Sequence, residues 1–324
     1  MKKSVTAIAH PNIALVKYWG NRDHPLRLPS NGSISFNLAA LETRTTIEAK
    51  SGLEEDTLIF NGKLQSGPAL KRVQRFMDII RQASINGGYA QITSDNNFPV
   101  SAGLASSAAA FAALAVAGAA AYGLDYSERK LSRLARLGSG SAARSVPDGY
   151  VEWTSSLKDD DSFAFTIFPA DHWELWDCIA LVEVAPKETG STEGHLLAGT
   201  SPLQAARIAD TPRRLGLCRS AIQHKDFETL AKLIELDSHM LHAVMLTSQP
   251  PLMYWESTSM TIMKAVTDWR RRGIPAAFTL DAGPNVHVIC EAGHEKDVLE
   301  KLSDIPGVMQ VLSSPIGVGA RIIH

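Results

Sequence analysis

Residues 99–111 place the strongest constraint on the fold, because they read Pro99-Val-Ser-Ala-Gly-Leu-Ala-Ser-Ser-Ala-Ala-Ala-Phe111. The proline ends the preceding element, and Gly103 permits a turn that a Cβ would hinder. Ser106 and Ser107 then stand where a helix can begin, and the alanines that follow are the best helix formers. Such a loop presents free N–H groups and the positive end of a helix dipole, which can hold a phosphate. An alanine-rich core helix without a ligand is the alternative.

The same stretch, as Pro-x3-Gly-Leu-x-Ser-Ser-Ala, resembles the phosphate-binding signature of the GHMP kinase superfamily, which includes galactokinase, homoserine kinase and mevalonate kinase. It differs from the P-loop, since the chain contains no Gly-x4-Gly-Lys-[Ser/Thr]. The resemblance implies ATP and Mg²⁺ as cofactors, with Ser107 as a metal ligand. It also implies nucleotide contacts from Asn97, Ser101, Gly103, Leu104, Ala105, Ser106 and Ser107.

Composition limits the class of protein. A chain of 324 residues can form two domains around a large core, and 45% hydrophobic with 20% charged residues is typical of a soluble globular protein. A net charge of −2 offers no overall basic surface for nucleic acid. The three cysteines are scattered and odd in number, which indicates neither a disulfide framework nor a CxxC metal site. We therefore expect a cytoplasmic location.

Two segments resemble membrane-directed sequence. The basic N-terminus is followed by an apolar stretch, but Asn12 and Lys17 interrupt it too early for a signal peptide. Residues 102–124 carry no charge and are long enough to cross a bilayer. They consist mostly of alanine, glycine and serine, which insert poorly. We expect no membrane contact and a buried helix at 102–124.

Periodicity predicts the remaining elements. Alternating or β-branched residues predict strands at 5–19 (interrupted at Pro11 and Asn12), 34–38, 43–49, 151–153, 163–168, 178–184, 286–291 and 320–324, with a hairpin at Asn61-Gly62. Amphipathic patterns predict helices at 68–84, 127–138, from Ser201-Pro202 onward, 227–246 and 257–272.

A second motif lies at residues 9–23, Ala9-His-Pro-Asn-Ile-Ala-Leu-Val-Lys-Tyr-Trp-Gly-Asn-Arg-Asp23. A strand that runs into Lys17, Tyr18 and Trp19 suits the wall of a site, although a snorkelling side chain on an edge strand is the commoner role for a lysine. Pro-Asn-Ile-Ala-x-x-Lys-Tyr-Trp-Gly-x-Arg-Asp strongly resembles the N-terminal signature of diphosphomevalonate decarboxylases, which use ATP to decarboxylate phosphorylated mevalonate. The resemblance implies substrate contacts from Tyr18, Trp19 and Asn21.

A third motif is Gly138-Ser-Gly-Ser-Ala-Ala-Arg-Ser145. Its Gly-x-Gly-x-x-Ala is a weak dinucleotide match without the required strand and long helix, and a turn with a solvated Arg144 is the plain alternative. The motif closely resembles the second signature of the decarboxylases, which implies that Ser139, Ser141 and Arg144 contact substrate. The family usually continues with aromatic-Gly-Gly, where this chain has Val146-Pro-Asp-Gly149.

The fourth motif, Thr279-Leu-Asp-Ala-Gly-Pro-Asn285, places Asp281 at the end of a predicted strand beside a Gly-Pro turn. A carboxylate there is a catalytic candidate, and a turn-forming aspartate is the alternative. The motif resembles the decarboxylase signature almost residue for residue.

The matches to the decarboxylases extend from residue 9 to residue 286, so the resemblance covers nearly the whole chain. It implies the α+β, two-domain GHMP fold, with a first half similar to domain 2 of ribosomal protein S5, a ferredoxin-like second half and an active-site cleft between them. We place the domains at residues 1–175 and 176–324. A phosphorylated mevalonate as substrate and a homodimer are also implied.

The resemblance assigns the chemistry to three residues. A tertiary alcohol leaves poorly, so the 3-hydroxyl of the substrate is first phosphorylated by ATP. Asp281 would orient or deprotonate that hydroxyl, and Lys17 would neutralise charge near Asp281 and the transferred phosphate. Arg144 would hold the carboxylate, because its guanidinium donates two parallel hydrogen bonds. Phosphate and CO₂ then leave an alkene.

Two other function classes remain open: a GHMP kinase that stops at the phosphoester, such as a mevalonate 3-kinase, and a non-catalytic protein on a related fold. The joint presence of Lys17, Arg144 and Asp281 argues against both.

The sequence also bears on which mevalonate is used. Diphosphomevalonate decarboxylases usually read Lys-Tyr-Trp-Gly-Lys-Arg-Asp, and Asn21 stands here in place of a lysine that they use against the diphosphate. Pro68 stands where some members carry a second phosphate-binding arginine. We therefore expect mevalonate 5-phosphate as substrate and isopentenyl phosphate as product. The alternative is the 5-diphosphate, giving isopentenyl diphosphate, with Arg22, Lys71 or Arg72 replacing the missing lysine.

Overall fold

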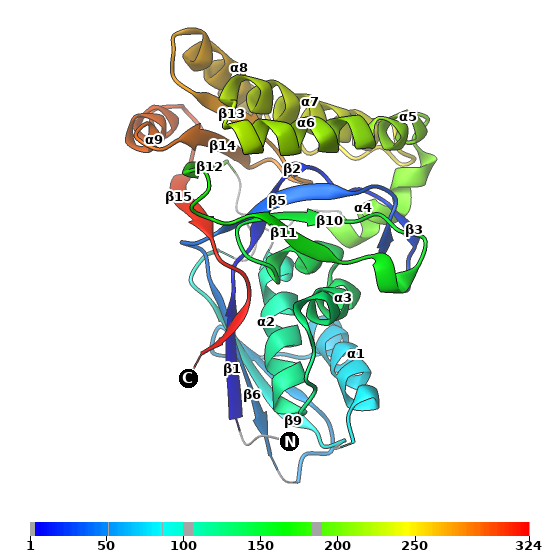
Figure 1. Cartoon of the computed structure of the whole chain (residues 1–324). Coiled ribbons are helices and arrows are strands. Elements are labelled where there is room, and N and C mark those ends of the chain that lie inside the picture. Colours follow the sequence, from blue (N-terminus) through cyan, green and yellow to red (C-terminus); the bar gives the residue numbers. More distant parts are fainter. Residues whose placement is uncertain (1–3, 51, 86, 100–105, 183–189, 324) are drawn as a thin grey trace.

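The computed structural model describes residues 4–50, 52–85, 87–99, 106–182 and 190–323. Figure 1 shows two layered parts, one built on the N-terminal strands and the other carrying the helices of residues 204–303. Strands and helices are mixed in both parts, which confirms the expected α+β fold of two halves.

The first sheet contains the N-terminal strand. Its members, in spatial order, are β16 (Arg321–Ile323), β1 (Ser4–Ala9), β6 (Thr43–Ala49), β9 (Ala90–Asn96), β7 (Thr57–Phe60) and β8 (Lys63–Leu64). Neighbours are antiparallel except β7 and β9. The predicted strand at 43–49 is confirmed, and so is the hairpin, whose Asn61 and Gly62 both have the positive φ that a tight turn needs.

Two helices, α1 (Gly67–Ala83) and α2 (Ser106–Ala121), pack on this sheet, and α3 (Glu128–Gly138) packs on α2. α1 buries Phe76, Met77 and Ile80, the predicted apolar face. α2 packs on β1 and β6 on one side and on α3 on another, so its alanines are buried almost all round. No helix of the described residues is long and apolar enough to cross a membrane. The cytoplasmic location stays a prediction.

The second sheet joins the two halves of the chain. Its spatial order is β11 (Ala164–Phe168), β10 (Tyr150–Trp153), β5 (Ser33–Leu38), β15 (Gln310–Gly317), β12 (Leu175–Leu181), β14 (Val286–Glu291) and β13 (Ala276–Thr279), with β2 (Asn12–Val16) also paired to β5. β5 meets β15 through Leu38 opposite Ile316 and Asn37 opposite Gly317. Because this sheet contains strands from both halves, the division after residue 175 stays a prediction.

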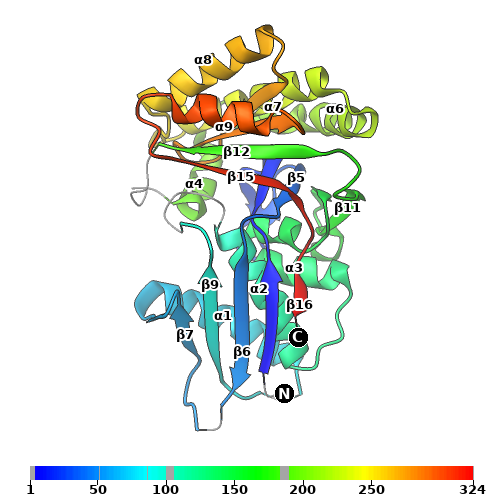
Figure 2. The same ribbon diagram turned by 90° about the vertical axis from the view of Figure 1, so that its left-hand side faces the viewer.

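Helices of the second half cover one face of that sheet (Figure 2). The covering helices are α6 (Thr211–His224), α7 (Phe227–Leu246), α8 (Ser257–Arg271) and α9 (Glu295–Ser303), whereas α4 (Ser191–Leu197) lies on the other side of β12 and β15 in Figure 2 and α5 (Gln204–Ala209) packs on α6 and α7. α7 and α8 pack on β13, and α9 packs on β12 and β15. A separate ribbon pairs β3 (Asn21–Asp23) with β4 (Leu28–Pro29), and short 3₁₀ turns are η1 (Gly140–Ser145), η2 (Asp159–Asp161) and η3 (Ala198–Thr200).

The predicted helix at 227–246 is confirmed, whereas several features of the second half differ from expectation. α5 begins at Gln204 rather than at Ser201-Pro202, which form a turn. α6 was not predicted, because its buried face includes Arg214 and therefore lacks apolar periodicity. β15 was not predicted, because its Ser-Ser-Pro sequence lacks the alternation of a half-buried strand.

Candidate active site

A cavity of about 180 Å³ lies between the two halves. Its lining residues are Asn12, Ala14, Lys17, Tyr18, Trp19, Ser106, Ser107, Ser141, Arg144, Ser191, His195, Leu241, Asp281 and Ala282. The cavity thus brings together the residues proposed for catalysis, which lie up to 264 positions apart in the sequence. Titratable groups that converge in a cleft mark it as the candidate active site.

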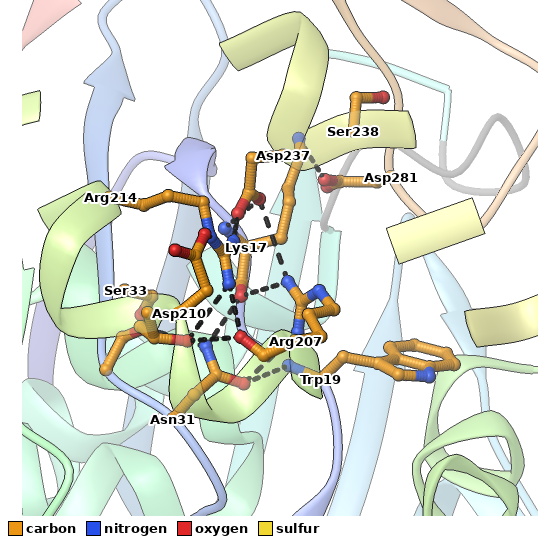
Figure 3. A network of polar contacts seen from close by, with 12 residues as sticks. Lys17, Trp19, Asn31, Ser33, Arg207, Asp210, Arg214, Asp237, Ser238 and Asp281 are labelled. Atoms are coloured by element: carbon orange, nitrogen blue, oxygen red, sulfur yellow. Dashed lines mark hydrogen bonds and ion pairs between the residues drawn. The ribbon is translucent and has the colours of Figure 1, made fainter. Parts of the chain in front are cut away.

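Lys17 and Asp281 both line this cavity and form an ion pair (Figure 3). Lys17 is the first residue after β2, and Asp281 follows the end of β13. The Lys17 Nζ lies 2.7 Å from the Asp281 Oδ1, and the lysine is 2% exposed against 33% for the aspartate. The aspartate therefore presents its carboxylate to the cavity, while the lysine supports it from the protein side.

Electrostatics keep this carboxylate ionised. Burial raises the pKa of Asp281, but the charge of Lys17, followed by those of His287 and Arg144, outweighs burial and holds the pKa at about 2. Burial in turn lowers the pKa of Lys17, against the opposing effect of Asp281. At neutral pH the cavity contains an aspartate that can accept a hydrogen bond from a substrate hydroxyl.

Arg144 is a buried cation held by neutral groups. Its Nε donates to Ser35 Oγ at 3.0 Å and its Nη1 to Ser33 Oγ at 2.8 Å, while Nε and Nη2 both reach the amide oxygen of Asn12. In the described part of the chain no carboxylate lies within ion-pair distance of it, and burial lowers its pKa to about 10. One N–H of each terminal nitrogen is not used by these contacts, so the guanidinium can receive an anion from the cavity.

Three side chains form an aromatic and polar wall. His195 stacks on Tyr18, with ring centroids 4.2 Å apart, and also contacts Trp19. Its Nδ1 accepts a hydrogen bond from the Gly20 N–H at 2.9 Å, which leaves the proton on Nε2. Burial, then the charge of Arg27, lowers the pKa of His195 to about 3, so the ring is neutral. The Tyr18 hydroxyl donates to Asn21 Oδ1.

The serines of two motifs meet at one end of the cavity. Ser106 and Ser107 begin α2 and line the cavity, and Ser107 Oγ lies 3.1 Å from Ser139 Oγ. Ser141 also lines it. Gly140 has to be a glycine, because a Cβ there would lie 2.7 Å from the Tyr18 hydroxyl. These placements agree with a phosphate site at the start of α2.

Some expected residues do not reach the cavity. Asn97 is exposed, and its amide is bound to the backbone of Ala40 and Glu42. That pairing holds a turn between strands, so the proposed nucleotide contact of Asn97 lacks support from its position. Four other proposed nucleotide contacts lie outside the described residues: Ser101, Gly103, Leu104 and Ala105.

Sequence reasoning missed the contributions of Asn12, Ser191 and His195 to the cavity. Asn12 stood inside a recognised motif, which was the available signal for its role. Ser191 and His195 lie on α4, where nothing in the local sequence distinguishes cavity-facing from solvent-facing residues.

Two family models match successive parts of the chain. Residues 9–164 match the diphosphomevalonate decarboxylase-like N-terminal domain, and residues 178–314 match the mevalonate 5-diphosphate decarboxylase C-terminal domain. The diphosphomevalonate decarboxylase of Candida albicans is 39% identical over 98% of this chain and 97% of its own length.

Solved structures agree with this match. The mevalonate diphosphate decarboxylase of Staphylococcus aureus has a TM-score of 0.95 at 38% identity, over 100% of this chain and 99% of that one. An enzyme abbreviated MDDEF, solved with MVAPP, AMPPCP and magnesium, has a TM-score of 0.92 at 36% identity, over 99% of both chains. By sequence and by structure, this chain belongs to the mevalonate diphosphate decarboxylase family of the GHMP superfamily.

Proposed function

We propose that this chain uses ATP to decarboxylate a mevalonate that carries phosphate at its 5-position. The observation that supports this most directly is the pairing of the Lys17–Asp281 ion pair with the anion-accepting Arg144 in one cavity. A kinase acting on a hydroxyl requires only the first of these features. A carboxylate that is to leave as CO₂ also needs a cationic partner that fixes its direction.

The roles of the residues follow from this geometry. The carboxylate of Asp281 accepts the hydrogen bond of the 3-hydroxyl and orients its oxygen toward the γ-phosphorus of ATP. Lys17 balances the charge that gathers during the transfer. The C3–O bond then breaks, phosphate leaves with the electron pair, and the bond to the carboxylate supplies the electrons of the new double bond. Arg144 holds that carboxylate until CO₂ departs.

The start of α2 fits the nucleotide phosphates, because Ser106 and Ser107 line the cavity at a helix N-terminus, where the helix dipole favours an anion. Ser107 is the residue that we expect to bind Mg²⁺, and the ion, when bound, neutralises charge on the transferred phosphoryl group. MDDEF was solved with AMPPCP and magnesium, which supports both requirements.

The 5-substituent of the substrate has two candidate forms. The relatives are named for mevalonate diphosphate, and these names support the 5-diphosphate better than the 5-phosphate that the sequence led us to expect. We nevertheless propose the 5-phosphate, because a specific feature of this cavity favours it. Among the described lining residues, Lys17 and Arg144 are the only cations, and both are required at the reacting end.

The wall left for the 5-substituent is neutral. Tyr18, Ser141 and His195 carry no charge at neutral pH, and Asn21 binds Tyr18. Arg22 is occupied by the backbone oxygens of Pro29 and Ser30. A phosphate monoester carries about two negative charges and a diphosphate more, so the larger group needs cationic partners that this wall lacks.

Product analysis with both substrates tests these proposals together. We expect CO₂ release to depend on ATP, with kcat/KM for the 5-phosphate at least about tenfold above that for the 5-diphosphate, the effect of one missing charged hydrogen bond. The opposite preference would leave the diphosphate as substrate. ADP formation without CO₂ would identify a 3-kinase, and no turnover of either compound would indicate a binding protein.

Asn21→Lys should raise kcat/KM for the 5-diphosphate about tenfold and change that for the 5-phosphate less, because the ammonium adds a cation beside Tyr18. Asn21→Met is the matched control, since it adds length without charge. Equal gains from both variants would assign the preference to cavity shape instead.

The homodimer also stays a prediction, which sedimentation analysis can test.

A further inference from the structure

The segment Lys17–Gly20 lies beyond the end of β2 and is held mostly by side chains, together with one backbone hydrogen bond from the Ser30 N–H to the Gly20 carbonyl. The Trp19 N–H donates to Asn31 Oδ1 at 3.4 Å, and the Trp19 carbonyl accepts from Gln204 Nε2 at 2.8 Å. The Gly20 N–H is bound by His195. The backbone that carries Lys17 therefore depends on groups supplied largely by the second half of the chain.

Asp237 and Arg207 form hydrogen bonds with the main chain of Lys17 itself (Figure 3). The Lys17 N–H donates to Asp237 Oδ2 at 2.7 Å, and the Lys17 carbonyl accepts from Arg207 Nη2 at 2.7 Å. Asp237 lies on α7 and Arg207 lies on α5, so side chains from two helices bind the same residue, Lys17. The carbonyl also accepts from Asn31 Nδ2 at 2.9 Å.

The charged side chains around the Lys17 main chain are buried, and a gain in folding stability does not account for the cost of removing them from water. Asp237, Arg207 and Arg214 are each no more than 1% exposed. Arg214 pairs with Oδ1 of Asp237, the carboxylate oxygen that does not bind the Lys17 N–H, and the Arg207 Nη2 lies 3.7 Å from Asp237 Oδ2. Buried ion pairs rarely add net stability over apolar residues of similar size, whereas they do define geometry. The geometry defined here is that of the lysine whose ammonium meets Asp281.

Lysine positioning matters because its side chain is long and flexible. An ordered lysine loses side-chain rotamer entropy, and a fixed main chain spares the ion pair with Asp281 the further cost of ordering the backbone. A displacement of about 1 Å at a reacting group can cost about a hundredfold in rate. Both the N–H and the carbonyl of Lys17 are hydrogen-bonded, which restricts the backbone from which its side chain extends.

We propose that Arg207 and Asp237 are positioning residues for Lys17: by binding its carbonyl and N–H, they hold its ammonium against Asp281. The proposal rests on the proposed function for its kinetic readout, but its structural content concerns this ion pair alone. The other titratable groups that face the pair are Asp177 on β12, His287 on β14, Arg144 on η1 and His242 on α7.

Arg207→Gln and Arg214→Gln form a matched pair, because both remove a buried guanidinium that pairs with Asp237, and only Arg207 touches Lys17. We expect Arg207→Gln to lower kcat at least about thirtyfold with KM values within about threefold, and Arg214→Gln to lower kcat at most about threefold. Similar losses in melting temperature would show that both variants are equally perturbed as folds.

A pH titration distinguishes a displacement of Lys17 from a general loss of rigidity in the protein. When Lys17 is displaced, the pKa of Asp281 should rise, because burial is then less opposed. We expect the carboxyl ¹³C resonance of Asp281 to titrate at higher pH in Arg207→Gln than in the parent, and at the parent value in Arg214→Gln. This readout needs no substrate, so it remains valid even if the parent releases no CO₂, an outcome that would reject the proposed function alone.

Arg207→Lys provides the rescue, since an ammonium can keep one hydrogen bond to the Lys17 carbonyl. Its kcat and titration should lie between those of the parent and Arg207→Gln. Equal effects of Arg207→Gln and Arg214→Gln on both readouts would overturn the proposal. If Arg207→Gln does not fold, parent-like kcat and Asp281 titration in Arg207→Met, which keeps a long side chain but has no donor for the Lys17 carbonyl, would overturn it as well.

Discussion

Asp281→Asn should lower kcat at least about a thousandfold while the protein stays folded, the scale of losing a principal group in a polar active site. The amide keeps the size of the carboxylate but cannot hold the 3-hydroxyl through a charged hydrogen bond or take its proton. The measurement is ATP-dependent CO₂ release, with circular dichroism as the check on folding. Activity within a few-fold of the parent would rule out the proposed role of Asp281.

The depressed pKa of Asp281 makes a second, independent measurement possible. Its value in the folded protein is about 2, below the 3.8 of an unperturbed aspartate. Because the folded pKa is the lower one, Asp281 contributes stability that is fully present above about pH 4 and is lost as pH falls toward 2. The difference in melting temperature between the parent and Asp281→Asn should therefore shrink as the pH is lowered through this range.

The same pKa bears on the role of the residue. A carboxylate with a pKa near 2 is a weak base at neutral pH, because an efficient general base has a pKa close to the working pH. Phosphoryl transfer has a loose transition state in which little proton removal is needed early. Orientation of the hydroxyl is thus the larger part of what Asp281 contributes, and proton acceptance follows as the phosphoryl group arrives.

The sequence predicted the local elements and the three charged residues that meet in the cavity better than the supports around them. Lys17, Arg144 and Asp281 were identifiable because each stands in a short motif with characteristic neighbours. Asp237 and Arg207 stand in no such motif, and their value comes from reaching Lys17 across 220 and 190 positions of sequence. Contacts between residues so far apart in the sequence depend on how α5 and α7 pack. The periodicity of apolar residues does not reveal that packing.

A similar limit applies to the lining of the cavity. Asn97 stood beside the phosphate-binding motif, and proximity in sequence placed it near the nucleotide, yet its amide holds a turn. His195 was not predicted, because only the packing of α4 against Tyr18 and Trp19 brings it inward. Residues adjacent in the sequence can point in opposite directions where a strand ends. Residues on helices that are far apart in the sequence can line the same cavity.

Arg144→Ala should separate the two halves of the reaction. The guanidinium is proposed to bind the carboxylate that leaves as CO₂, and truncating one partner of a buried charged pair costs about 2–5 kcal/mol, or about thirtyfold to several thousandfold in rate. We expect CO₂ release to fall by about a hundredfold or more. The Kd for ATP, measured by calorimetry, should change by less than about threefold, because Arg144 contacts Asn12, Ser33 and Ser35 rather than the start of α2.

The sharper measurement compares ADP and CO₂ in the same sample. If Arg144 serves the carboxylate, phosphorylation of the 3-hydroxyl should survive its loss better than decarboxylation, so ADP should exceed CO₂ in early turnovers. Arg144→Lys keeps the charge without the forked pair of donors and should fall between the parent and the alanine variant. Equal losses of ATP binding and CO₂ release would instead place Arg144 on the nucleotide phosphates, since a group that binds them would weaken both steps from the start.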